Sequence, residues 1–250
     1  MYRLGRGVKK SDEEAARWIR KAADQGRPDA QLAVAIMYAE GRGVERNDKE
    51  AARLYRQAAE QGQAEAQFFL GHAHSLGEGV EKNFGEEARW FRKAADQGHN
   101  PAQVHLALMY ADGRGVEKNE KEAVRWYRIG AEQGYDAAMC NLGFMYEMGQ
   151  GVEKDDKKAV HWFRFAAEQG HVEAQCKLGG AFAVDQGVEQ DDKEAVHWYR
   201  YAAEQGDADA QCHLAIMFGH GDGVEQNDKE ASRWYRLAAE QGHTHAQFKL

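Results

Sequence analysis

The side chains of this 250-residue chain best suited to metal binding or catalysis are its 11 histidines and three cysteines. Such side chains could hold a metal ion, and a histidine beside a serine or carboxylate could act as a general base. Their spacing favours neither role. There is no His-Glu-x-x-His or Cys-x-x-Cys motif, and His72 and His74 would point to different sides of a helix. No Ser/His/Asp set stands out either, so we expect no metal site, no cofactor and no enzymatic activity.

Six Gly-x-Gly-Val strings raise the possibility of a phosphate-binding loop. None continues to Gly-Lys-Ser/Thr, and none follows an expected strand. The motif instead ends at Val8 and then every 36 residues up to Val224, with one copy altered to Asp-Gln-Gly-Val. An acidic-Gln-Gly motif has the same period, from Gly26 to Gly242. This regularity indicates a repeat protein in which the glycines are expected to end helices.

Each 36-residue unit has the pattern of two short helices. In the second unit, apolar residues at i, i+4, i+7 and i+8 predict a helix over residues 29–40, which Gly41 stops. Asn47 or Asp48 is the expected N-cap of a second helix that ends at Gly62. Neither helix can bury its apolar face alone, so neighbouring pairs must stack. We predict an all-α solenoid of antiparallel helix pairs.

The units run through residues 1–250 as a single array, without a linker or a shift in composition. Met1-Tyr2 corresponds to Met37-Tyr38, in the middle of a first helix, so we expect the array to be cut out of register and to belong to a longer one. Uncapped ends would permit head-to-tail self-association. No signal peptide is evident, which predicts a cytoplasmic protein; a periplasmic one stays open if a leader precedes this chain.

The repeating unit resembles the Sel-1-like repeat (SLR), a relative of the tetratricopeptide repeat (TPR). It reads Ala-Gln-x-x-Leu-x-x-Met-Tyr-x-x-Gly-x-Gly-Val and later Trp-aromatic-Arg-x-x-Ala-Glu-Gln-Gly. The resemblance implies a right-handed superhelical solenoid that acts as an adaptor or scaffold in protein complexes. One unit carries the pattern with Ala102, Gln103, Leu106, Met109, Tyr110, Gly113, Gly115, Val116, Ala123, Trp126, Tyr127, Arg128, Ala131, Glu132, Gln133 and Gly134.

Positions that are constant from unit to unit are expected to build the solenoid. All six tryptophans share one such position and should form an aromatic core between stacked pairs. Arg20 and its six counterparts each have an acidic residue four positions on, which predicts a ladder of i,i+4 ion pairs. Cys140, Cys176 and Cys212 share an otherwise apolar position. Equivalent helices should lie about 8–10 Å apart, too far for a disulfide, so we expect three separate buried thiols.

Positions that vary between units gather in one stripe on the first helices, as a recognition surface would. In TPR relatives, first helices line the concave side, so the stripe is expected to form a groove for a peptide or protein. The alternative is that these side chains only complete helix packing. The candidate binding residues are Phe69, His72, His105, Leu108, Asn141, Phe144, Met148, Lys177, His213, Ile216 and His220. A second row, on the second helices, becomes apolar at Ile129, Phe165, Tyr201 and Leu237.

Composition limits the possible partners. The formal net charge is -8 and no basic block occurs, which argues against nucleic acid. No apolar run approaches the ~20 residues that a membrane helix needs. The leading prediction is a non-catalytic scaffold or adaptor that binds a peptide or protein in its concave groove. The alternative is a bacterial envelope accessory protein that binds glycan or polymer-synthesis machinery.

Overall fold

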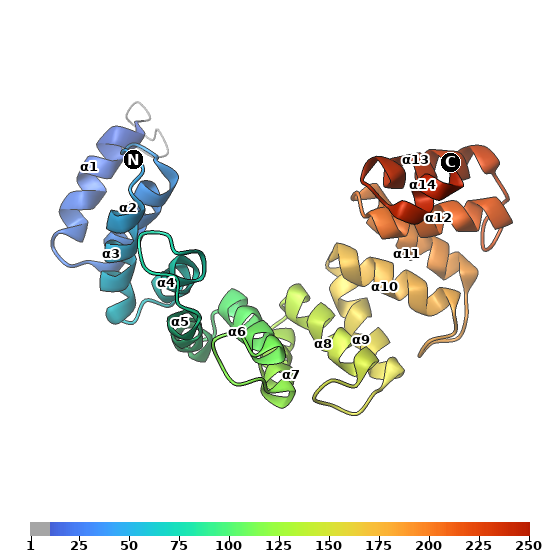
Figure 1. The fold of residues 1–250 in the computed structure, drawn as a ribbon, viewed down its shortest axis with the longest axis horizontal. Coiled ribbons are helices and arrows are strands. Elements are labelled where there is room, and N and C mark those ends of the chain that lie inside the picture. Colours follow the sequence, from blue (N-terminus) through green and yellow to red (C-terminus); the bar gives the residue numbers. More distant parts are fainter. Residues whose placement is uncertain (1–10) are drawn as a thin grey trace. The chain divides into compact units, whose positions relative to one another are not determined.

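The computed structural model describes residues 11–250, which form 14 α-helices and no β-strand. The motif that ends at Val8, together with Met1 and Tyr2, lies outside the described residues. The helices follow in the order α1 (Asp12–Ala23), α2 (Pro28–Glu40), α3 (Asp48–Glu60), α4 (Ala64–Leu76), α5 (Phe84–Asp96), α6 (Asn100–Asp112), α7 (Glu120–Glu132), α8 (Asp136–Met148), α9 (Asp156–Glu168), α10 (Val172–Ala183), α11 (Asp192–Glu204), α12 (Ala208–His220), α13 (Asp228–Glu240) and α14 (Thr244–Lys249) (Figure 1).

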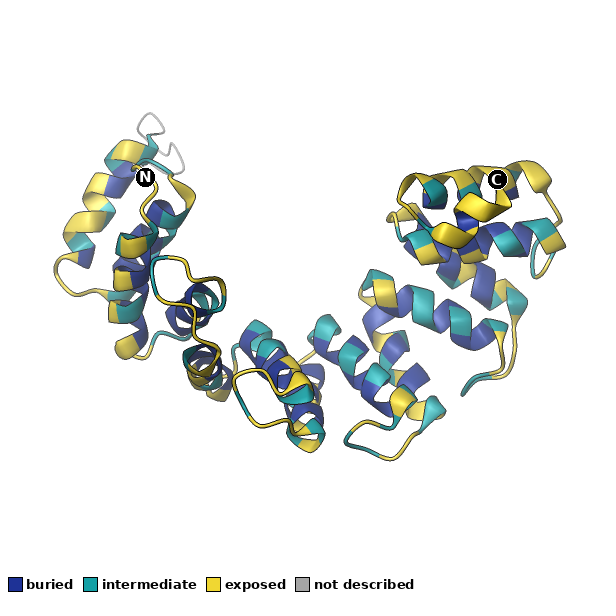
Figure 2. Cartoon of the chain, in the orientation of Figure 1, coloured by how far each residue is buried: buried dark blue, intermediate teal, exposed yellow. Residues whose placement is uncertain are grey.

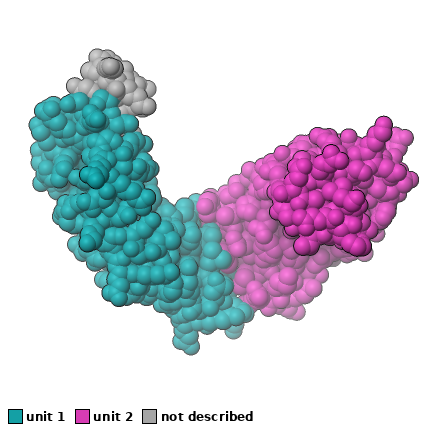
Figure 3. All heavy atoms as spheres, turned by 45° about the horizontal axis from the view of Figure 1, so that its top comes forward, with its two compact units in different colours: residues 1–126 teal, residues 127–250 magenta. Residues whose placement is uncertain are grey.

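The chain divides into two compact units, residues 1–126 and 127–250 (Figure 3). In the first unit α2 packs on α3 and α4 on α5, and α3 and α5 in turn contact the helices that follow them. The second unit repeats this arrangement from α8 to α14. Each unit is therefore a stack of helix pairs, and the predicted all-α solenoid fold is confirmed.

The predicted helix boundaries in the second repeat are confirmed. Helix α2 ends at Glu40, and Gly41 follows in the left-handed conformation with φ 67°. The side chain of Asn47 accepts a hydrogen bond from the backbone N–H of Glu50 and so caps α3. Some first helices are capped by a histidine instead. The ring Nδ1 of His99 accepts a hydrogen bond from the backbone N–H of Ala102. His171 and His243 do the same, which gives three of the histidines a structural role.

The two glycines of the Gly-x-Gly-Val motif have different roles. The first ends a first helix, as expected. The second is not a helix stop, because a Cβ there would overlap the backbone carbonyl at the start of the preceding second helix. Gly43 lies against Asp12 in this way, and Gly79 against Asp48. This motif therefore supplies one helix end and one backbone contact between successive repeats.

Glutamine side chains join successive repeats. Buried Gln67 donates a hydrogen bond through Nε2 to the carbonyl of Ala59 at 3.0 Å, which satisfies the end of α3. Its Oε1 accepts from Nε2 of Gln97, in the acidic-Gln-Gly motif after α5, at 2.8 Å. The same bond joins Gln31 to Gln61, Gln175 to Gln205 and Gln211 to Gln241. These ladders account for the constant glutamines.

The core follows the constant positions, with one partial exception (Figure 2). The alanines that face neighbouring helices are buried, as are Trp90, Trp126 and Trp234. Trp162 and Trp198 are only half-buried, and Trp18 is 49% exposed. The prediction that all six tryptophans form a core is therefore correct for three of them.

The fixed arginines do not form the predicted ion-pair ladder. Within residues 11–250, none pairs with the carboxylate four positions on. Arg20 instead lies over the ring of Tyr38, 5.8 Å from its centroid, and Arg128 donates to the hydroxyl of Tyr146 at 3.1 Å. The arginine side chain faces the following first helix, so the aromatic ring on that helix is nearer than the carboxylate of its own helix. These contacts join one helix to the next, where an i,i+4 pair would have joined turns of one helix.

Two repeats depart from the common pattern, one where Phe84-Gly85 replaces the usual acidic residue and lysine at the start of α5, and one at the end of α10. At the first, Asn83 still caps α5, which keeps its 13 residues. At the second, Asp185 replaces the usual capping glycine and itself adopts a positive φ of 57°. Helix α10 has 12 residues, against 13 in α2, α4, α6, α8 and α12. Only the second departure therefore alters a helix end.

Candidate binding surface

The stripe residues of the first unit lie on α4 and α6. Phe69, His72 and His105 are half-buried, and Leu108 is 37% exposed. The ring of Phe69 stacks on Tyr55, with centroids 5.3 Å apart. The rings of His72 and His105 meet edge to face at 4.8 Å. The structure therefore brings His72 and His105 together across adjacent repeats.

Burial governs the ionisation of these histidines. Burial, together with the smaller effects of His72 and Arg114, lowers the pKa of His105 to about 4. Burial also lowers the pKa of His72 and of His99, whose ring lies 4.7 Å from that of Phe68. The three rings are neutral near pH 7, and their environment is that of a packed aromatic cluster.

The stripe residues of the second unit lie on α8, α10 and α12. Asn141, Phe144, Lys177 and Ile216 are half-buried, whereas Met148, His213 and His220 are exposed. Lys177 forms an ion pair with Glu147 at 3.2 Å and lies over the ring of Phe144 at 4.7 Å, so two stripe residues from adjacent repeats are in contact. Asn141 is bound to its own helix, through a hydrogen bond to the carbonyl of Ala137 at 2.7 Å.

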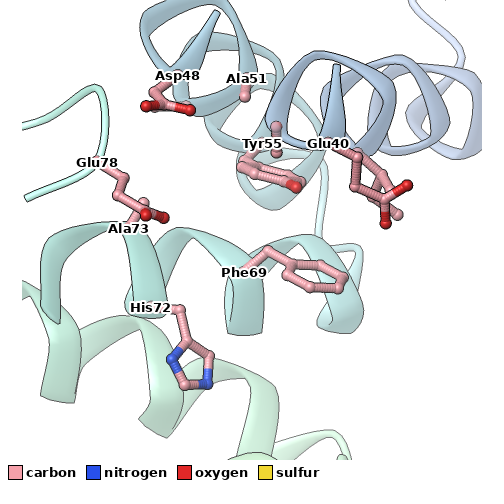
Figure 4. Close-up of a pocket in the computed structure, with 11 residues that line it drawn as sticks. Glu40, Asp48, Ala51, Tyr55, Phe69, His72, Ala73 and Glu78 are labelled. Atoms are coloured by element: carbon pink, nitrogen blue, oxygen red, sulfur yellow. The ribbon is translucent and has the colours of Figure 1, made fainter. Parts of the chain in front are cut away.

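A pocket of about 240 Å³ opens between α2, α3 and α4 (Figure 4). Tyr55 and Phe69 form its aromatic floor. Asp48 and Glu78 lie together on one side, and Glu40 lies on the other. The pocket therefore combines an apolar floor with an acidic rim. Alanines at 39, 51, 52 and 73 and the side chains of Ile36 and His72 complete its lining.

A second pocket of about 240 Å³ lies between α10, α11 and α12. It occupies the same place in its repeats as the first, four repeats further along the chain. Tyr199 corresponds to Tyr55, Asp192 to Asp48, and Asp222 to Glu78. His213 replaces Phe69 in the floor and stacks on Tyr199, with centroids 5.0 Å apart. Its lining residues are Ala183, Gln190, Asp192, Tyr199, His213, Ile216, Met217 and Asp222.

At two other junctions, side-chain pairs cross the corresponding space. In the repeat after the first pocket, Glu87 stands where the other repeats have alanine, and it accepts from Arg114 at 2.9 Å. In the repeat before the second pocket, Gln186 donates to Asp156 at 3.3 Å. These pairs explain why adjacent repeats of similar sequence present different surfaces. Whether a pocket forms at a junction therefore depends on the side chains that occupy these variable positions.

A separate aromatic row lies on the second helices of the second unit. Phe165 on α9 and Tyr201 on α11 are 44% and 48% exposed, and each meets a histidine edge to face at 4.8 Å. Leu237 on α13 is 36% exposed and continues the row. The corresponding residues of α1, α3 and α5 are Lys21, Gln57 and Lys93, so this apolar row distinguishes the second unit from the first.

Residues 11–250 contain no cluster of three or more His, Cys, Asp or Glu side chains that could hold a metal ion. No helix in that range is long and apolar enough to cross a membrane. The three cysteines are free thiols. Cys140 and Cys212 are buried, but Cys176 is only half-buried, which differs from the prediction. Burial nevertheless raises the pKa of Cys176 to about 12, so this thiol is a weak nucleophile.

Stacked helix pairs with variable inter-repeat surfaces define an α-helical repeat solenoid. Its seven segments match the model of the Sel1 repeat, and the chain belongs to the Sel1 repeat family. Proteins of this family generally act as protein-interaction scaffolds and are typically non-catalytic. The matched segments are residues 1–26, 28–63, 64–99, 100–135, 136–171, 172–207 and 208–243.

Solved structures show the same fold. A protective antigen of uropathogenic Escherichia coli with an SLR fold is 36% identical with a TM-score of 0.91; the match covers 94% of this chain and 50% of that one. A Sel1 repeat protein from Oxalobacter formigenes is also 36% identical, with a TM-score of 0.83 and 94% coverage of both chains. An immunity protein of Pseudomonas aeruginosa shares the fold at 21% identity, with a TM-score of 0.53 and coverage of 85% and 80%. No curated protein matches.

Proposed function

We propose that this chain is a non-catalytic scaffold that binds a peptide or protein through the variable stripe on its first helices. One observation carries the proposal: none of the 11 stripe side chains is buried, whereas constant residues of the same helices are. Leu106 and Met109 on α6, for example, are 1% and 0% exposed, while Leu108 between them is 37% exposed. Variation is thus concentrated where it does not disturb the core.

The chemistry of the stripe suits a partner with both apolar and charged groups. Leu108 and Met148 present exposed apolar side chains, and the two pockets add aromatic floors with acidic rims. Apolar anchors of this kind provide most of the energy when a peptide binds a helical groove. Several such contacts along one scaffold would add through effective concentration.

The test is a selection of peptides from a displayed library against the wild-type protein, followed by affinity measurements. Leu108→Asp and Met148→Asp each remove an exposed stripe residue without opening the core. For peptides bound at that position, we expect roughly tenfold weaker binding or more. Phe165→Asp is the matched control, since the exposure of Phe165 (44%) lies between those of Leu108 (37%) and Met148 (61%) but Phe165 lies on a second helix. Peptides that resist both stripe variants, or that are lost with Phe165→Asp, would contradict the proposal.

A further inference from the structure

The rims of the two equivalent pockets differ in two charged residues: Glu40 of the first corresponds to Val184, and Arg46 corresponds to Gln190. In the first pocket, Arg46 places Nε 3.0 Å from Asp48 and Nη2 3.7 Å from Glu78. One guanidinium of the chain itself thus pairs with both carboxylates on that side of the pocket. Arg46 is exposed, and it precedes α3 by two residues, so it reaches the rim from the loop. The geometry shows that this carboxylate pair accepts a guanidinium.

In the second pocket the corresponding residue is Gln190, which carries no charge. It donates a single hydrogen bond to Asp192 at 3.1 Å. Asp222 has His220 at 3.5 Å as its neighbour, an exposed imidazole that is a cation only when protonated. Asp192 and Asp222 therefore both line the second pocket, as Asp48 and Glu78 line the first, but no guanidinium of the chain pairs with them.

The floor of the second pocket suits the planar face and the methylene stem of an arginine side chain. Tyr199 and His213 form a stacked aromatic surface, and Ile216 and Ala183 add aliphatic contacts. A guanidinium stacks on aromatic rings while its methylene stem covers apolar surface. His213 keeps an exposed edge, but desolvation of its ring in the pocket lowers its pKa, so the neutral ring does not repel a cation near pH 7. At about 240 Å³ the pocket is smaller than the ~300–1,000 Å³ of small-molecule sites, as expected for a single side chain.

We propose that the pocket between α10, α11 and α12 binds an arginine side chain of the partner protein or peptide. The guanidinium pairs with Asp192 and Asp222 at the rim, as Arg46 pairs with Asp48 and Glu78 at the first pocket, and the side chain lies against Tyr199. This inference deepens the proposed function and rests on it, because His213 and Ile216 of the pocket belong to the stripe. At the first pocket Arg46 of the chain itself already pairs with the rim carboxylates, so the two units are not equivalent as binding surfaces.

The test titrates N-acetyl-arginine amide into the isotope-labelled full chain and follows backbone amide shifts by NMR. We expect saturable shifts at Asp192, Tyr199 and Asp222. The citrulline analogue, which has the same shape without the charge, should bind roughly tenfold more weakly or worse, because charge-assisted hydrogen bonds are lost. Asp222→Asn should weaken arginine binding to a similar extent; Asp222 is exposed, so this substitution leaves the fold intact.

A pair of exchanged residues provides the sharpest control. Gln190→Arg recreates the internal cation of the first pocket, and it should abolish the shifts although every carboxylate remains. Arg46→Gln frees the first pocket and should produce new shifts at Asp48, Tyr55 and Glu78. Arginine that binds the Gln190→Arg variant as well as wild type, or that shifts no residue of the second pocket, would overturn the inference.

Failure of the pocket and failure of the scaffold are distinguishable. If library peptides bind through Leu108 and Met148 but arginine causes no shifts, the proposed function stands and the arginine site falls. If arginine binds this pocket but the selected peptides are unaffected by the stripe variants, the arginine site stands and the proposed role of the stripe falls.

Discussion

The backbone carbonyl of Asp48 lies directly against Gly79, which belongs to the next repeat. No Cβ fits between them, and the φ of Gly79 is 69°. The two repeats are thus in direct backbone contact at this point, with no side chain between them.

Gly79→Ala should therefore destabilise the fold more than Gly77→Ala, two residues earlier. Both glycines have positive φ, so each alanine pays about 1–2 kcal/mol for the left-handed conformation. At Gly77 a Cβ meets only ordinary contacts, the nearest at 3.5 Å. At Gly79 the backbone must also move, and we expect a loss of about 3–5 kcal/mol. Urea denaturation of both variants checks this; equal losses would show that the close approach is not important.

Two tryptophans from the same position of the repeat should differ in their contribution to stability. Trp90 is 2% exposed and Trp18 is 49% exposed. Trp90→Ala should cost about 3–5 kcal/mol of unfolding free energy, and Trp18→Ala about half as much. Thermal denaturation followed by circular dichroism measures both. A loss for Trp18→Ala as large as that for Trp90→Ala would mean that the exposed surface of Trp18 is covered in solution.

Acidification should weaken the first unit. His105 has a pKa of about 4 in the folded chain, against about 6.5 when unfolded. The unfolded chain therefore binds more protons between these values, and stability falls as the pH drops from about 6.5 to about 4. His72 and Arg114 face His105 and oppose its protonation as well.

His105→Asn tests this dependence, because Asn141 occupies the same position one repeat later. Urea midpoints measured at pH 7 and pH 5 should differ less in the variant than in wild type. An unchanged difference would assign the pH dependence to other groups.

Arg114→Ala should destabilise the chain by about 1–3 kcal/mol, because it leaves the carboxylate of Glu87 buried without its charged partner. Burial already raises the pKa of Glu87 in the presence of Arg114. Glu87→Ala restores the alanine found in the other repeats and should cost much less. In that background Arg114→Ala should be nearly neutral. A double-mutant cycle measures the coupling, and additive losses would contradict the pairing.

The period and the glycine caps predicted the helices well, because both depend on local sequence. Asn47 and Gly41 perform their capping roles with neighbours a few residues away. Interactions between repeats were harder to predict. The arginines were assigned to carboxylates of their own helix, although their partners are rings 18 residues on. The constant glutamines carry a usable signal, since a polar residue fixed at a core position implies a buried hydrogen bond.

The pockets could not be predicted from any single position. Each requires residues from three helices, and each is open only where no neighbouring side chain crosses it. Glu87 and Arg114 cross one junction, while alanine and a carboxylate at the same positions leave the first pocket open. This difference depends on side-chain length and direction, which the repeat pattern does not contain.

The contact between Gly79 and Asp48 has an evolutionary consequence. Glycine and main chain form it at several junctions, so it is independent of the side chains that each repeat displays. A repeat could therefore be duplicated, deleted or recombined with another without redesign of its neighbours. New binding specificities could arise by shuffling existing modules, each carrying its own open or closed pocket.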